Sequence, residues 1–105
     1  MDEIWLIRST FAKKDEAISV ARELLEQKLI ACANIEEGMT ALFRWEDMIQ
    51  QEPETVLLAK TVRRHAPQVI AHIKTLHSYQ IPSILAWPAG AVEPSFAAWV
   101  AAEVS

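Results

Sequence analysis

The sequence predicts a single α+β domain spanning residues 1–105, and three observations support this fold class. The length matches the commonest domain size and leaves no room for a second core. Hydrophobic residues make up 51% and charged residues 23% of the chain, a balance that is typical of globular proteins. Short apolar runs of strand type alternate with segments whose apolar residues recur at helical spacing. We therefore expect one hydrophobic core shared by strands and helices.

The N-terminal half predicts a strand, a helix and a long bent strand. Residues 4–7 form an apolar run with β-branched and aromatic members, which is typical of a strand buried on both faces. From Ala17 onward apolar residues recur at helical spacing, with acidic residues near the start and Lys28 near the end, as the helix dipole favours. Residues 30–45 then return to a strand pattern, in which Gly38 and the two glutamates before it predict a bend or bulge.

The C-terminal half predicts a long strand, a helix, a short strand and a final short helix. Glu46-Asp47 can make a tight reversal, after which residues 48–62 form a third strand. Pro67 stands where the first position of a second helix is expected. Residues 81–87 predict a fourth strand, and Pro94 opens a short C-terminal helix.

The resulting order β-α-β-β-α-β matches the ferredoxin-like split βαβ sandwich, whose antiparallel sheet carries its two main helices on one face. Two helices cover only one side of the sheet, yet the first and third strands are apolar on both sides, so the uncovered face needs another protein surface. The long second and third strands would also extend past so small a domain and leave edges to protect. The pattern therefore predicts self-association.

Composition and charge argue against several classes of partner. The net charge is −4 and the ten basic residues are scattered, so we expect no nucleic-acid binding. The apolar runs are far shorter than the ~20 residues that a membrane-spanning helix needs. The acidic start, residues 1–3, predicts no export signal, and the single Cys32 cannot form an intramolecular disulfide. We therefore expect a cytoplasmic protein.

Three sequence blocks carry a resemblance to a known family: ACANI at residues 31–35, FRWE at 43–46 running on to LLAKT at 57–61, and LHSYQIPSILAWP at 76–88. Together these blocks resemble the CutA family over nearly the whole chain and in the correct order. The resemblance implies a ferredoxin-like subunit, an unusually stable homotrimer and an association with tolerance to copper and other divalent ions. It also implies a trimer plan similar to that of PII signalling proteins.

The resemblance places the family's proposed copper ligands at Cys32 and His77. A thiolate and an imidazole suit copper, and the fold can join ligands that are distant in sequence. Alternatively, Cys32 packs as a small apolar residue of a buried strand, and His77 continues the apolar stripe of the second helix. The family's usual carboxylates near the histidine are absent, because Gln80 and Ser83 stand in their places. We expect at most weak binding of copper or another divalent ion.

A second candidate site combines four polar or aromatic residues that match the family: Trp45, Glu46, Lys60 and Tyr79. Lys60 follows a buried apolar run, so its ammonium needs a partner, for which Glu46 or Tyr79 is suitable. The cluster would act either as a lock between subunits or as a cleft for a small anion or metabolite.

We expect no enzymatic activity, because the chain has only two glycines, no glycine-rich phosphate loop and no paired-histidine metal motif. The leading hypothesis is a homotrimeric divalent-cation tolerance protein without an organic cofactor that acts through an unknown protein partner or small ligand. The first alternative is a PII-like sensor that holds a small molecule between subunits, with copper incidental. The second is a purely structural or anchoring trimer.

Overall fold

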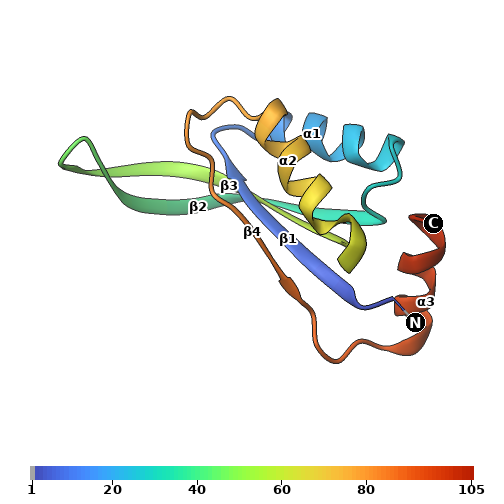
Figure 1. Cartoon of the computed structure of the whole chain (residues 1–105). Coiled ribbons are helices and arrows are strands. Elements are labelled where there is room, and N and C mark those ends of the chain that lie inside the picture. Colours follow the sequence, from blue (N-terminus) through green and yellow to red (C-terminus); the bar gives the residue numbers. More distant parts are fainter. Residues whose placement is uncertain (1) are drawn as a thin grey trace.

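The alternating apolar pattern builds one antiparallel sheet with the strand order β2-β3-β1-β4, as a computed structural model of residues 2–105 describes it (Figure 1). The α+β class with a four-stranded antiparallel sheet is thus confirmed. The strands are β1 (Ile4–Phe11), β2 (Cys32–Trp45), β3 (Met48–Val62) and β4 (Ile84–Pro88).

Two helices, α1 (Lys14–Glu26) and α2 (Ala66–Leu76), lie on the same face of the sheet (Figure 1). A third helix, α3 (Pro94–Glu103), lies at the end of the molecule far from the tip of the β2–β3 hairpin. Proline occupies the first turn of both α2 and α3, where a missing N–H costs no helical hydrogen bond. A single 3₁₀ turn (Arg63–His65) joins β3 to α2.

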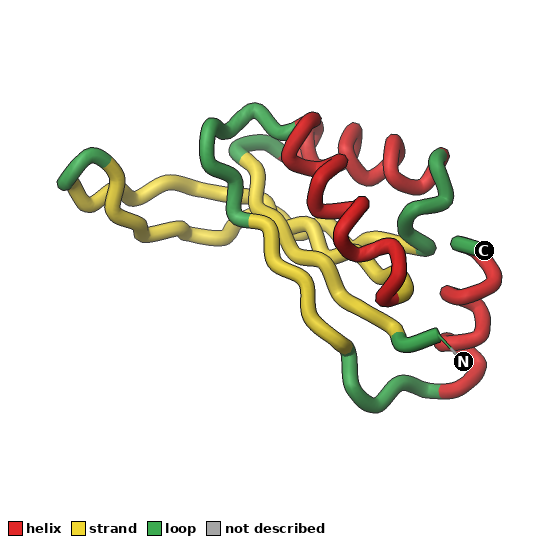
Figure 2. The backbone as a smooth tube through the Cα atoms, in the orientation of Figure 1, coloured by secondary structure: helices red, strands yellow, loops and turns green. Residues whose placement is uncertain are grey.

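The β2–β3 hairpin is the longest feature of the chain and projects beyond the body (Figures 1 and 2). Its two-residue turn has φ of +50° at Glu46 and +64° at Asp47, and positive φ at both positions suits the right-handed twist of paired strands. Gly38, with φ of +86°, lies in the predicted bulge, between Glu36 and Met39. The molecule measures 46 × 26 × 22 Å, and its radius of gyration of 14.3 Å exceeds the roughly 13 Å of a compact chain of this size.

The hydrophobic core lies between the sheet and the helices α1 and α2. Alternate strand residues point into it, and α1 contributes one stripe at helical spacing. Its fully buried large side chains are Ile7, Phe11, Leu24, Ile30, Leu57, Val69 and Ile73. Burying one such side chain contributes about 1.5–3 kcal/mol. A smaller cluster around Val62 and Val100 fixes α3 to the body.

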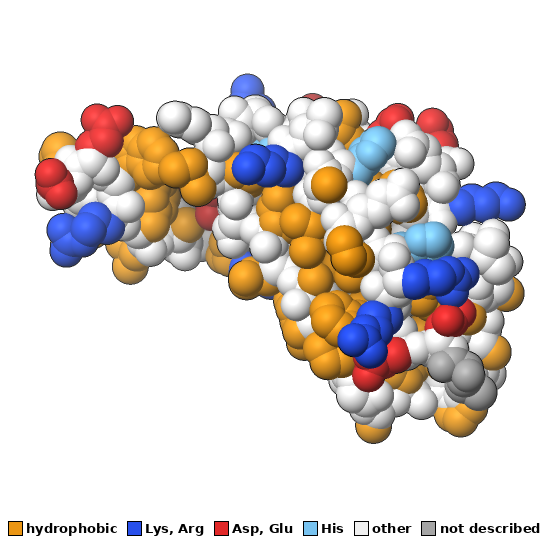
Figure 3. Space-filling view, viewed as in Figure 1, with side chains coloured by type: hydrophobic (Ala, Val, Ile, Leu, Met, Phe, Trp, Pro, Cys, Tyr) orange, Lys and Arg blue, Asp and Glu red, His pale blue; other side chains and the backbone are white. Residues whose placement is uncertain are grey.

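The opposite side of the sheet, here called the open face, is covered within residues 2–105 only at one end, where Ile4 and Val62 pack against α3. It is formed by Leu6, Arg8, Cys32, Asn34, Val56, Leu58, Lys60, Leu85 and Trp87, which alternate with the core residues along their strands. Leu85 on this face is 55% exposed, and beyond the body the hairpin exposes Met48 at 64% and Ile49 at 73% on opposite sides of its ladder. Figure 3 shows hydrophobic side chains gathered on the projecting hairpin.

Two sequence-based expectations need correction. β1 is buried mainly on its core side, because Leu6 and Arg8 remain half-exposed on the open face. The fourth strand begins at Ile84 instead of residue 81, since Ser9 is the last β1 residue that pairs with β4 and Pro82 has no N–H to donate to a ladder. No helix within residues 2–105 has the length and apolar character required to span a membrane.

Candidate functional site

His77 is buried at the end of α2, between the end of β1 and the start of α1. One ring nitrogen, Nε2, lies 2.8 Å from the carbonyl oxygen of Thr10, and the other, Nδ1, accepts the backbone N–H of Tyr79 at 3.1 Å. A carbonyl can only accept, so these two bonds describe a neutral ring with its proton on Nε2. The ring also stacks on Phe11, with centroids 4.2 Å apart. Both nitrogens are therefore engaged within the chain.

Residues 77–79 form a strap that ties the end of α2 to two other elements. Glu16 of α1 accepts from the backbone N–H of Ser78 at 2.8 Å and from its hydroxyl at 2.9 Å. The Tyr79 hydroxyl donates to Glu54 of β3 at 2.7 Å. Burial raises the pKa of Tyr79, and the hydrogen bond to Glu54 raises it further. Sequence reasoning missed both glutamates, because Glu16 is 62 residues from Ser78 and no local motif joins them.

Cys32 opens β2 on the open face, directly across the ladder from Lys60. Its thiol is free and half-buried. Burial raises the pKa of the Cys32 thiol, while the Lys60 ammonium lowers it in part. The thiol is therefore mostly protonated at neutral pH, and a metal that binds there must displace a proton.

One chain does not bring Cys32 and His77 together. Cys32 pairs with Lys60 of β3, whereas Thr10, which contacts His77, pairs with Val56 of the same strand. Val56 and Lys60 are four residues apart along β3, which corresponds to roughly 13 Å. The two side chains also lie on opposite sides of the sheet, because His77 stacks on a core residue. Within residues 2–105 no group of three or more His, Cys, Asp and Glu side chains is placed to hold a metal ion. An ion shared by these two residues would need more than one copy of the chain.

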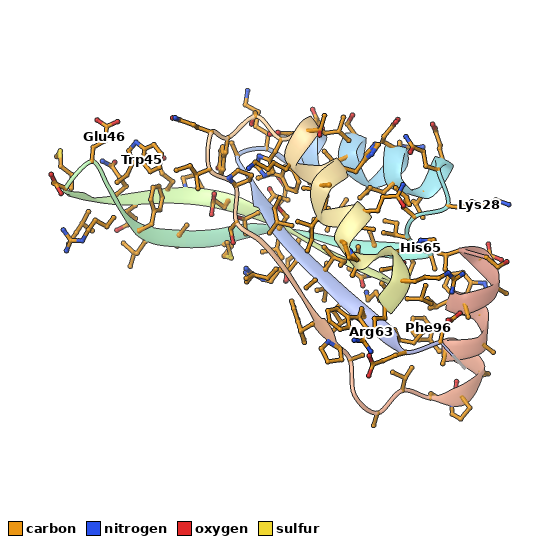
Figure 4. The ribbon with its side chains drawn as sticks, viewed as in Figure 1. Lys28, Trp45, Glu46, Arg63, His65 and Phe96 are labelled. Atoms are coloured by element: carbon orange, nitrogen blue, oxygen red, sulfur yellow. The ribbon has the colours of Figure 1, made fainter. Side chains whose placement is uncertain are left out.

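The second candidate cluster is also divided. Trp45 and Glu46 lie together at the hairpin tip, where the indole N–H donates to the carboxylate at 3.1 Å (Figure 4). Lys60 lies near the other end of β3 and donates to the amide oxygen of Asn34. Tyr79 binds Glu54, as described above. Lys60 therefore contacts neither predicted partner in one chain, because the length of the hairpin separates it from Glu46.

Arg8 is a residue of the open face that sequence reasoning missed. It lies in the middle of β1, and its guanidinium Nη2 is 3.3 Å from the Sδ atom of Met39 in β2. Strand alternation could have predicted its position, because Arg8 follows the core residue Ile7 and therefore lies on the same face as Leu6. A cation at such a position is unusual, because its neighbours on that face are mainly apolar.

Comparison with known proteins gives concordant results. Residues 5–103 match the family model of the CutA1 divalent ion tolerance protein. The chain is 33% identical over 100 residues to the divalent-cation tolerance protein CutA of Thermus thermophilus, covering 95% of each chain. It is similar to the crystal structure of CutA1 from Ehrlichia chaffeensis, with a TM-score of 0.95, 30% identity and coverage of 100% and 98%. The periplasmic CutA of Archaeoglobus fulgidus gives a TM-score of 0.94 at 32% identity, with coverage of 97% and 99%.

Proposed function

We propose that this chain acts as a homotrimer in the tolerance of or response to divalent cations, without enzymatic activity. The chain belongs to the CutA1 divalent ion tolerance family. The open face is the observation that carries the proposal. It presents Leu6, Val56, Leu58, Leu85 and Trp87 on one side of the sheet, while the other side of the body is packed against α1 and α2. A contiguous apolar surface of this kind marks a protein–protein contact.

The projecting hairpin supports a ring of copies over a simple pair. The exposed apolar residues Leu42 and Ile49 lie on the side of the hairpin away from Trp45, and so form a different surface from the open face of the body. When two different patches of one chain bind each other between copies, the contact is heterologous and forms a closed ring where the rotation between copies closes. Three copies would close such a ring with each hairpin lying on a neighbour.

Sedimentation equilibrium tests the assembly. We expect a mass of about three times 11.8 kDa at micromolar concentration. Measurement over a range of concentrations gives the association constant together with the mass. A monomer at these concentrations would refute the trimer, and a stable dimer would refute the ring of three while leaving an interface on the open face.

Copper or another divalent ion, in this proposal, is bound weakly, with Cys32 as the ligand that the open face offers. His77 would have to give up the N–H of Tyr79 to free Nδ1 for a metal. Cys32→Ser should keep the trimer and lower copper affinity in competition with a chelator. His77→Ala should lower it only if the histidine is a ligand. Unchanged copper affinity in Cys32→Ser would remove this thiol from the site.

A second candidate function is the binding of a small molecule between subunits, as in PII-like proteins. It is favoured by one observation: the open face carries the cations Arg8 and Lys60, and cations repel metal ions. A thermal-shift series with metals and with small metabolites separates the two functions, since a ligand of the native trimer raises its melting temperature. No shift with either class would favour an anchoring trimer that acts through a protein partner, which co-purification from its own cell would identify.

We also propose a cytoplasmic location, on the ground that a half-buried free thiol persists best in a reducing compartment. Cell fractionation with a periplasmic marker tests this proposal. Recovery of the protein with that marker would refute it.

A further inference from the structure

Two cations lie in the middle of the open face, on the two central strands of the sheet. Arg8 belongs to β1 and Lys60 to β3, and both side chains are half-buried in the single chain. Apolar residues surround them: Leu58 and Leu85 lie directly across the ladders from Arg8, and Leu6 lies across from Lys60. The two positions are therefore among the first to lose solvent when another copy covers this face.

Among residues 2–105, neither Arg8 nor Lys60 has a carboxylate partner. In the part of the chain from residue 2 to 105, the Lys and Arg side chains that form ion pairs are exposed ones, Lys14 with Glu37 and Arg64 with Asp2. The guanidinium of Arg8 contacts a thioether sulfur, which is a weak acceptor for a group with five N–H donors. Lys60 has the neutral amide oxygen of Asn34. Strong acceptors for both groups must come from outside the chain.

When another copy covers the open face, Arg8 and Lys60 lose their contact with water and have a greater need for an anionic partner. Removal of an unpaired cation from water is costly, and in a symmetric ring it recurs at the two cations of every copy. An oxyanion matches the planar fork of an arginine and can accept from a lysine at the same time. Among the hairpin carboxylates, Glu37, Glu46 and Glu54 already accept from donors of their own chain, which leaves Glu36, Asp47 and Glu52 of a neighbouring copy as the competing acceptors.

We propose that the open face is a binding site for a small phosphate-like oxyanion, anchored by the guanidinium of Arg8 and the ammonium of Lys60 and enclosed between copies. The inference rests on the proposed trimer and names the class of ligand that its interface would take. Asn34 positions Lys60 for this role, and the Cys32 thiol lies beside it on the same face.

Isothermal titration of inorganic phosphate into the native protein, at fixed ionic strength in a chloride buffer, tests the site. We expect saturable binding that Arg8→Gln and Lys60→Gln each weaken by about tenfold or more, the usual effect of losing a charged hydrogen bond. Arg8→Lys keeps the charge without the fork and should lose less affinity than Arg8→Gln. The matched control is Arg22→Gln, an exposed arginine of α1 on the other side of the sheet, which should bind phosphate like the unchanged protein.

Sedimentation of every variant, run in parallel, separates this inference from the proposed assembly. If the unchanged protein is not a trimer, the proposed function fails whatever phosphate does. If it is a trimer and gives no phosphate heat, or if Arg8→Gln and Arg22→Gln bind phosphate equally, the oxyanion site is refuted while the trimer stands. Loss of assembly in Arg8→Gln without any phosphate binding by the unchanged protein would likewise refute it, and would assign the anion to a carboxylate of the neighbouring copy.

Discussion

Successive residues of β3 lie in two different surroundings. Leu57 and Ala59 are fully buried beneath the helices, whereas Val56 and Leu58, each one position away, stay half-exposed on the open face. All four are apolar, so the difference comes from what lies over each side of the sheet. Helices α1 and α2 cover one side of the sheet, while the open face on the other side leaves its apolar residues accessible to another protein.

The two faces also differ in how they treat polar groups. On the core side His77 is buried with both ring nitrogens bonded, as buried polar groups generally are. On the open face Arg8 and Lys60 have only weak or neutral acceptors. On the core side, the hydrogen-bond partners of polar groups come from the same chain. On the open face, we expect a partner to supply them.

We expect the largest loss of stability from a substitution that removes a buried side chain of the core. Leu24→Ala on α1 should lower the free energy of unfolding by about 3 kcal/mol, because it leaves a cavity among fully buried side chains. Chemical denaturation measures the loss, which we expect at every protein concentration. Leu25→Ala is the matched control, since that leucine is 40% exposed and should cost much less. Equal losses in the two variants would mean that an interface buries Leu25 as deeply as the core buries Leu24.

Trp45→Ala should change assembly and leave the core intact. An aromatic residue near an interface commonly contributes about 2 kcal/mol to association, and Trp45 lies exposed at the hairpin tip, away from the core. The association constant from sedimentation should fall, while the circular dichroism of the folded chain stays the same. Arg44→Ala, one residue earlier on the hairpin, is the control. Unaltered assembly in Trp45→Ala would exclude the tip from the interface.

Tyr79→Phe should lower stability by about 1 kcal/mol, because it removes a hydrogen bond to a carboxylate that is still partly exposed to water. The folded chain raises the pKa of Tyr79, so the contribution of its hydroxyl is present below the pKa of an unfolded tyrosine and is lost as the pH rises through the folded value. Unfolding curves of both proteins at neutral and at alkaline pH should therefore converge at the alkaline end. A constant difference between them would show that the hydroxyl acts through packing and not through its proton.

Glu93→Gln should give the smallest effect, confined to α3. The Ser95 hydroxyl and the backbone N–H groups of Ser95 and Phe96 donate to the Glu93 carboxylate and lower its pKa. This cap therefore acts above the ordinary glutamate pKa and is lost as the pH falls through the lowered one. Hydrogen exchange should be faster in the α3 amides of Glu93→Gln at neutral pH and equal to the unchanged protein in acid. Faster exchange in α2 as well would contradict a purely local cap.

The sequence predicted the elements of the fold well and the partners within the candidate site poorly. The bulge at Gly38, the reversal at Glu46 and the helix starts near Pro67 and Pro94 depend on backbone preferences of a few adjacent residues, and the structure has all of them. Within one chain Lys60 binds Asn34, because the β2–β3 register brings that residue within reach, and its expected partners Glu46 and Tyr79 stay a prediction for contacts between copies.

The sequence by itself determined which residues alternate between the two faces of the sheet, because a strand has a side-chain period of two whatever it packs against. Only the tertiary structure decided which of those faces α1 and α2 cover, and hence that Ile7 lies in the core and Arg8 on the open face. It also decided that His77 binds the carbonyl of Thr10, a contact that joins residues 67 positions apart. Such contacts follow from the packing of whole elements, which no local pattern contains.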